Sequence, residues 1–218
     1  SVKGGRFRSG LGYQNVQHPH AWDFADSSLM YRALFGEGYG NDGVQLKWLA
    51  PTELFVELGA EAGRGANFPG SDRNANGAGA TTLFGHLGGD VGTSHSWRAG
   101  VSYLHAKASE REGELEDALG ADIDTLFSGK SATWVADFVW KWAPDGNARE
   151  RNFSFATEYF RRTERGTLCE HDAVNEGCAA ASEDAYRARQ SGYYAQAVYQ
   201  FMPRWRTGYR YDRLNPGA

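Results

Sequence analysis

Residues 131–142 read SATWVADFVWKW, in which large apolar and polar side chains alternate. Successive side chains of an extended strand point to opposite sides, so one face carries Trp134, Phe138, Trp140 and Trp142 and the other carries Asp137 and Lys141. A strand with an aromatic face and a charged face suits a sheet that lies between lipid and a wet lumen.

The same period of two recurs along the chain. It predicts nine approximate strands, at 4–13, 42–50, 53–64, 81–92, 96–107, 131–143, 151–164, 189–202 and 204–214. From the second strand onward, short connections (50–52, 92–95, 143–147 and 202–203) alternate with long ones (65–80, 108–130 and 165–188). Short turns at one end and long loops at the other are typical of an up-and-down β-barrel of the outer membrane.

Outward positions in the later predicted strands are also apolar: Trp97, Ala99, Val101 and Tyr103; Phe153, Phe155 and Tyr159; Tyr193, Ala195, Ala197, Tyr199 and Phe201. The rings at the two ends of 189–202 bracket small residues, as aromatic girdles bracket the hydrocarbon band of a membrane. A β-sandwich with an aromatic buried face is the alternative.

We therefore predict a single all-β domain over residues 1–218, an antiparallel up-and-down transmembrane β-barrel. Nine strands is an odd number, whereas bacterial single-chain barrels have an even number. Either one strand is missed or the chain is a fragment of a larger barrel that further strands complete. Residues 14–41 are predicted to be irregular or folded into the lumen, with a helix, an inward loop and a strand all open for 27–35.

Composition narrows the function classes. A net charge of -4 and a pI near 5.9 argue against nucleic-acid binding. No stretch approaches the roughly 18 to 20 apolar residues of a transmembrane helix. No signal peptide begins the sequence, which fits a mature protein or an excised piece.

The two cysteines, Cys169 and Cys178, lie in a polar segment, which predicts a disulfide in an oxidising compartment. Two unrelated exposed thiols are the alternative. The acidic run 110–117 lacks the residue order of an EF-hand, so we expect a solvated external loop.

Charged side chains fall on the inward face of the predicted strands. The lumen-lining set is Lys47, Glu57, Glu61, Arg98, Asp137, Lys141, Glu158, Arg162, Arg206 and Arg210. Both signs are present, which suits either a water-filled channel or an interior filled with cross-strand ion pairs.

A second cluster, in the run HPHAWDFAD at 18–26, combines His18, His20, Asp23 and Asp26. In an extended backbone the two imidazoles point to the same side, and the carboxylates could complete a divalent metal site of the Zn²⁺ type. The alternative is that these side chains hydrogen-bond a loop folded into the lumen. No other cofactor is indicated, and the absence of hydrolase, zincin and phosphate-loop motifs predicts that the chain is not an enzyme.

The runs GRF (5–7), GLGY (10–13), HPHAWDF (18–24), DGVQLKWLAPT (42–52) and YQFMPRW (199–205) resemble proteobacterial porin-like outer-membrane barrels. Some members of that family are labelled zinc-regulated or TonB-dependent receptors. The resemblance implies an outer-membrane location with extracellular long loops, a lipid bilayer partner, and passage of small hydrophilic solutes or ions. Alternatives are the barrel part of a zinc-linked uptake receptor, a structural or adhesive surface barrel, and a homo-oligomeric arrangement of any of these.

Overall fold

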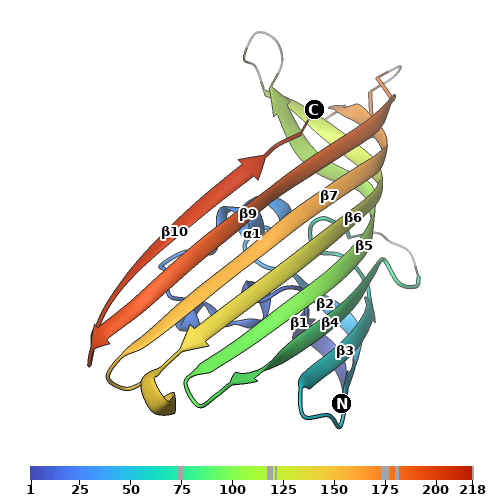
Figure 1. Ribbon diagram of the computed structural model, residues 1–218. Helices are drawn as coiled ribbons and strands as arrows, with labels where there is room; N and C mark the ends of the chain where they lie inside the picture. Colours follow the sequence, from blue (N-terminus) through green and yellow to red (C-terminus); the bar gives the residue numbers. More distant parts are fainter. Residues whose placement is uncertain (73–75, 117–119, 121, 173–176, 180–181, 218) are drawn as a thin grey trace.

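Figure 1 shows a computed structural model, which describes residues 1–72, 76–116, 120, 122–172, 177–179 and 182–217. The fold is one sheet of ten antiparallel strands in which neighbours in space follow one another along the chain. The strands are β1 (Val2–Arg8), β2 (Gly40–Leu49), β3 (Phe55–Gly63), β4 (Ala80–Val91), β5 (His95–Glu116), β6 (Asp122–Trp142), β7 (Asn152–Asp172), β8 (Gly177–Cys178), β9 (Asp184–Met202) and β10 (Trp205–Asn215).

The predicted antiparallel, up-and-down order is confirmed. Each of the nine predicted strands overlaps a strand of the sheet, and the tenth, β8, is a two-residue strand that pairs only with β7. The first prediction, 4–13, is wrong over residues 9–13, because β1 ends at Arg8. The sheet is not closed into a barrel. In the part of the chain that the structure describes, β1 pairs only with β2 and β10 pairs only with β9, so the sheet is an open, curved trough (Figure 1).

Residues 108–130 and 165–188 were predicted to be long connections, and the acidic run 110–117 a loop. These predictions are wrong for most of the residues, which belong to strands. β5 and β6 continue as a paired ribbon with Leu115 opposite Ile123, and Thr125 Oγ1 donates a hydrogen bond to the Gly113 carbonyl oxygen at 3.0 Å. A bulge between Ala108 and Arg111 marks where this extension begins. The tips of the three long connections lie outside the described residues.

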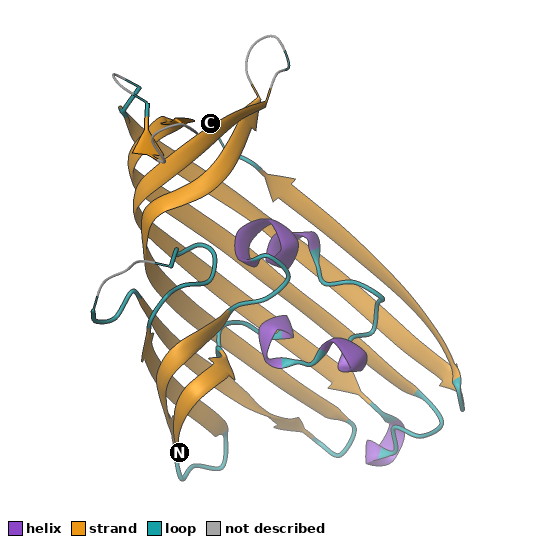
Figure 2. Cartoon of the chain, turned by 180° about the vertical axis from the view of Figure 1, so that it is seen from behind, coloured by secondary structure: helices purple, strands orange, loops and turns teal. Residues whose placement is uncertain are grey.

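Residues 9–39 connect β1 to β2 and lie inside the trough (Figure 2). They contain two 3-10 turns, η1 (Gln14–Val16) and η2 (Pro19–Ala21), and one helix, α1 (Leu29–Phe35); a third 3-10 turn, η3 (Pro144–Gly146), joins β6 to β7. Gly36 ends α1 in the left-handed conformation, φ 58°, where glycine carries no Cβ penalty. Residues 27–35 therefore form a helix within a segment that covers the concave face, which we call the inner segment (residues 9–39).

The hydrophobic core lies between the inner segment and the concave face of the sheet. Met30, Tyr31, Leu34 and Phe35 project from α1 and are buried with the wall residues Leu104, Val135, Phe160 and Tyr194. The Tyr31 ring meets the edge of Phe160 with 5.2 Å between centroids. The trough is thus filled by packed side chains where α1 crosses β5–β9.

The convex face exposes large apolar side chains on almost every strand. Trp48 is 57% exposed, Trp134 52% and Tyr209 70%, and many aliphatic residues share this face. Exposed apolar surface of this extent marks an interaction face in any protein. Among the described helices, none is long and apolar enough to cross a membrane.

Candidate functional site

Glu158 is the centre of the polar network on the concave face. Its carboxylate is fully buried and accepts hydrogen bonds from the backbone N–H groups of Tyr13 and Gln14 and from the hydroxyls of Tyr31 (3.1 Å) and Tyr194 (2.8 Å). Burial and the neighbouring Glu158 carboxylate raise the pKa of Tyr31 well above its usual value, so its hydroxyl stays a donor at neutral pH. One strand residue therefore holds both ends of the inner segment.

Glu61 and Arg98 hold the first turn of the inner segment. Glu61 Oε1 accepts from the Gly10 N–H at 2.8 Å and from Gln45 Nε2 at 2.7 Å. Arg98 donates to the Gly12 carbonyl oxygen at 3.2 Å and lies 3.5 Å from Asp137. These charges, predicted as lumen-lining, contact protein backbone.

The later part of the inner segment is bound by β7 and β10. Arg162 donates to the Leu34 carbonyl oxygen at 3.5 Å, and Arg206 pairs with Asp23 at 3.0 Å. Arg210 pairs with Asp26 at 2.7 Å. These three arginine side chains, predicted as lumen-lining, thus contact the segment that fills the trough.

Asp137 and His86 are buried polar residues that lie next to Gly100. Among the described residues, neither carboxylate oxygen of Asp137 nor His86 Nε2 has a hydrogen-bond partner. A Cβ at position 100 would clash with both side chains, so glycine is required there. His86 Nδ1 contacts Glu57 at 3.0 Å, and Lys47 lies 3.3 Å from the same oxygen.

Lys141, like Arg206, is exposed, but the carboxylate of Asp23 pairs with Arg206, whereas no ion pair of the described residues includes Lys141. It lines a pocket of about 840 Å³ at the short-turn end, between the inner segment and the sheet. Tyr13, Asp23, Asp90 and Asn152 share that pocket. Solvent-accessible polar groups of the concave face therefore lie together at the short-turn end, between the inner segment and the sheet.

Two strand residues of this network, Tyr194 and His86, were not predicted, and neither were Tyr13, Gln14 and Tyr31 of the inner segment. Tyr194 occupies an inward position of β9 and could have been found from the alternation alone. His86 was obscured because Gly85, Gly88 and Gly89 dilute the pattern of β4.

The predicted metal residues do not form a ligand set. His18 and His20 stack on each other with 5.6 Å between ring centroids, while Asp23 and Asp26 are paired with arginines of β10. Across the residues that the structure describes, no three His, Cys, Asp or Glu side chains are grouped so as to hold a metal ion. For the aspartates the arrangement matches the alternative interpretation, because Asp23 and Asp26 fasten the folded-in loop to β10.

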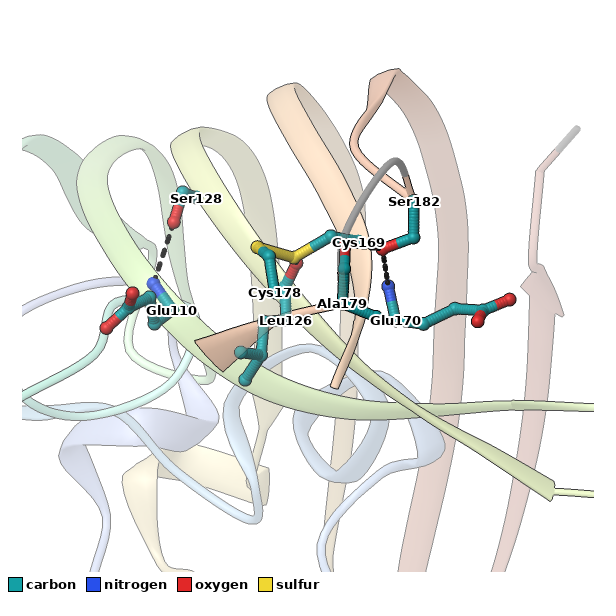
Figure 3. Close-up of a disulfide and its surroundings, with 8 residues drawn as sticks. All are labelled: Glu110, Leu126, Ser128, Cys169, Glu170, Cys178, Ala179 and Ser182. Atoms are coloured by element: carbon teal, nitrogen blue, oxygen red, sulfur yellow. Dashed lines mark hydrogen bonds between the residues drawn. A yellow bond between two sulfur atoms is a disulfide. The ribbon is translucent and has the colours of Figure 1, made fainter. Parts of the chain in front are cut away.

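The predicted disulfide is confirmed. Cys169 at the end of β7 is bonded to Cys178 of β8, with 5.5 Å between the Cα atoms (Figure 3). Nearby, the Glu170 N–H donates to Ser182 Oγ at 3.1 Å. The bond fastens β8 to the long-loop end of the sheet.

Comparison with known proteins gives one informative relative. A protein from Aquifex aeolicus (strain VF5), called "Uncharacterized protein", is 33% identical over 226 residues, which cover 98% of this chain and 44% of the relative. The chain thus spans less than half the length of the curated relative it matches. No protein-family model matches the chain, and no solved structure does.

Proposed function

We propose that this chain forms part of the wall of a porin-like channel in the bacterial outer membrane, which passes small hydrophilic solutes or ions. The observation that carries the proposal is the separation of the two faces of the sheet. The convex face exposes Leu46, Trp48, Val101, Trp134 and Phe138, whereas the concave face carries the carboxylate and guanidinium groups of the network. A wall between lipid and a polar lumen requires this separation.

The height of the apolar face supports the proposal. On β6 all outward positions from Ala132 to Trp142 are apolar, over ten residue steps. Ten residues of strand span about 33 Å, or about 25 Å along the membrane normal at the usual tilt of about 40°. That height matches the apolar band of outer-membrane barrels.

The connections at the two ends of the sheet differ in length, which supports the proposal. Short turns at 50–54, 92–94 and 203–204 lie at one end, and the extended β5–β6 and β7–β9 ribbons lie at the other (Figure 1). In the proposed orientation the ribbons and the Cys169–Cys178 bond face the outside, where disulfides persist. The free edges of β1 and β10 pair with further strands, because unpaired backbone cannot face lipid.

The inner segment defines where solute passes in this proposal. It fills the trough beside β5–β9, so the path runs along its open side and through the pocket that Lys141 and Asp90 line. Charged side chains at such a narrowing set the preference between anions and cations.

The test is the conductance of the full-length protein in planar bilayers, with the variant Lys141→Glu. Reversing this charge changes the energy of an ion at about 10 Å by roughly 0.8 kcal/mol in water, so cation permeability relative to the wild type is expected to rise about fourfold. The reversal potential under a KCl gradient measures the change.

Arg149→Glu is the matched control, since Arg149 is exposed in the β6–β7 turn and does not line the pocket. It is expected to keep the wild-type reversal potential. Absence of channel conductance in the wild-type protein would overturn the proposed function, and an unchanged reversal potential in Lys141→Glu would remove the pocket from the path.

A further inference from the structure

Four basic residues lie in one row across the convex face of the sheet. The strand register places Lys107 of β5 opposite Lys130 of β6, Lys130 opposite Arg165 of β7, and Arg165 opposite Arg187 of β9. All four side chains are exposed. Cross-strand neighbours of like charge destabilise a sheet, so in the absence of a ligand this row lowers the stability of the sheet.

Three more arginines extend the row toward β10. Relative to the row, Arg189 is displaced by two residues, Arg161 by four and Arg213 by six, each toward the short-turn end of its strand. The strands are tilted in Figure 1. A horizontal line across the sheet therefore meets each successive strand, from β5 toward β10, closer to the short-turn end of that strand. For a tilt of about 40° the displacement is about one residue per strand.

These seven side chains therefore fall within a band about 12 Å high. We call this band the basic belt (Lys107, Lys130, Arg161, Arg165, Arg187, Arg189 and Arg213). No Asp or Glu occupies an outward position of 97–107, 128–142, 153–167, 185–201 or 207–215. In the described part of the chain no member belongs to an ion pair. The cations of the belt thus lack acidic partners on their own face.

Aromatic rings lie beside and below the belt on the same face, with Trp134 opposite Arg161 and Tyr193 opposite Arg213. Tyr103 packs against Trp134 with 4.7 Å between centroids, and Tyr193 packs near Tyr211 at 6.0 Å. Tyrosine and tryptophan mark the level of lipid headgroups. The basic belt therefore lies just beyond the hydrocarbon boundary, on the side of the long ribbons.

We propose that the basic belt binds the phosphate groups of a phosphorylated glycolipid of the lipid A type in the outer leaflet, an inference that rests on the proposed outer-membrane location. Guanidinium groups bind phosphate through paired N–H donors, and ammonium groups bind it as point charges. A surface pocket of about 460 Å³ is lined by Thr163, Glu164, Arg165, Arg187, Ala188 and Arg189. The Glu164 carboxylate is paired with Arg111, at 2.8 Å, so the three arginines offer their donors to one headgroup. The acyl chains then lie against the aromatic rings below.

The experiment titrates the full-length protein, refolded in neutral detergent, with diphosphoryl lipid A, with the same glycolipid lacking phosphates, and with phosphatidylglycerol. The wild type is expected to bind diphosphoryl lipid A more tightly than either of the other two. The variant Lys130→Gln/Arg165→Gln/Arg187→Gln is expected to lose affinity on the order of 100-fold. Native mass spectrometry or thermophoresis reads out the dissociation constants.

The control variant Arg149→Gln/Arg151→Gln/Arg204→Gln removes three exposed charges at the short-turn end and is expected to bind like the wild type. Wild-type affinity in the belt variant would overturn the inference, as would equal binding of the phosphate-free glycolipid or of phosphatidylglycerol. Conductance is recorded on the same samples. A belt variant that conducts normally and still binds lipid A refutes only the belt, whereas a wild type that binds but does not conduct refutes only the channel.

Discussion

For single residues of the concave face, the sequence predicts which side of the sheet the side chain faces but not which residue it contacts. The alternation of β7 places Glu158 and Arg162 on the inward side, and both lie there. Their partners come from the inner segment, which has no periodic pattern and whose position depends on packing of α1 against Phe160 and Tyr194. Contacts of this kind join positions more than a hundred residues apart, so sequence spacing does not reveal them.

Glu158→Gln tests the centre of the network at this scale. The amide offers one acceptor oxygen and adds donors that face the backbone N–H groups of Tyr13 and Gln14, so the free energy of unfolding is expected to fall by about 2–4 kcal/mol. Urea unfolding in lipid vesicles, followed by tryptophan fluorescence, measures this loss. Limited trypsin digestion is expected to cleave sooner after Arg32 of the inner segment.

Glu150→Gln is the control, since Glu150 is exposed in a turn. Equal stability of Glu158→Gln and the control would show that the Glu158 carboxylate does not stabilise the inner segment.

Whole strands were predicted best where one face is apolar along the entire length. β6 was found from its aromatic face, and the order of all nine long strands followed from the turns. The ribbons beyond Lys107 and Arg165 were missed because neither of their faces is apolar along its length, which interrupts the alternation, although Leu126 and Phe127 are buried there. Paired backbone hydrogen bonds, and at β7 the disulfide to β8, maintain strand structure there without a continuous apolar face.

The disulfide is expected to stabilise only this end of the sheet. Replacing Cys169 and Cys178 together by Ser removes a cross-link over nine residues of sequence separation, worth roughly 3 kcal/mol. Amide hydrogen exchange is expected to quicken in β8 and in the last residues of β7, and to stay unchanged over Phe153–Arg162.

Uniform acceleration along β7 would contradict this prediction. It would mean that the bond contributes to global folding of the sheet.

At the scale of the whole molecule, the sequence predicted a barrel and the structure is an open trough with its own internal filling. Curvature and the polar lining follow from alternation, but closure depends on hydrogen bonds at two edges. The inner segment replaces water on part of the concave face, which a count of charged residues could not reveal because buried and solvated charges have the same spacing.

Single-tryptophan variants test which face meets lipid. A protein that retains only Trp134, which is 52% exposed on the convex face, is expected to lose most of its fluorescence in vesicles of brominated lipid. A protein that retains only Trp22, on the inner segment, is expected to lose little. Equal quenching of the two variants would contradict the assignment of the faces.

The direction of the edge strands limits how the wall can be completed. Each neighbouring pair along the nine-strand path is antiparallel, so β1 and β10 run in the same direction. If the two edges met, or if β10 met β1 of a second copy in the same membrane orientation, the new pair would be parallel. A wall of antiparallel pairs alone therefore needs an odd number of additional strands whose two outer members run opposite to β1 and β10. A second copy in the same membrane orientation adds nine strands, but it would meet both edges in parallel.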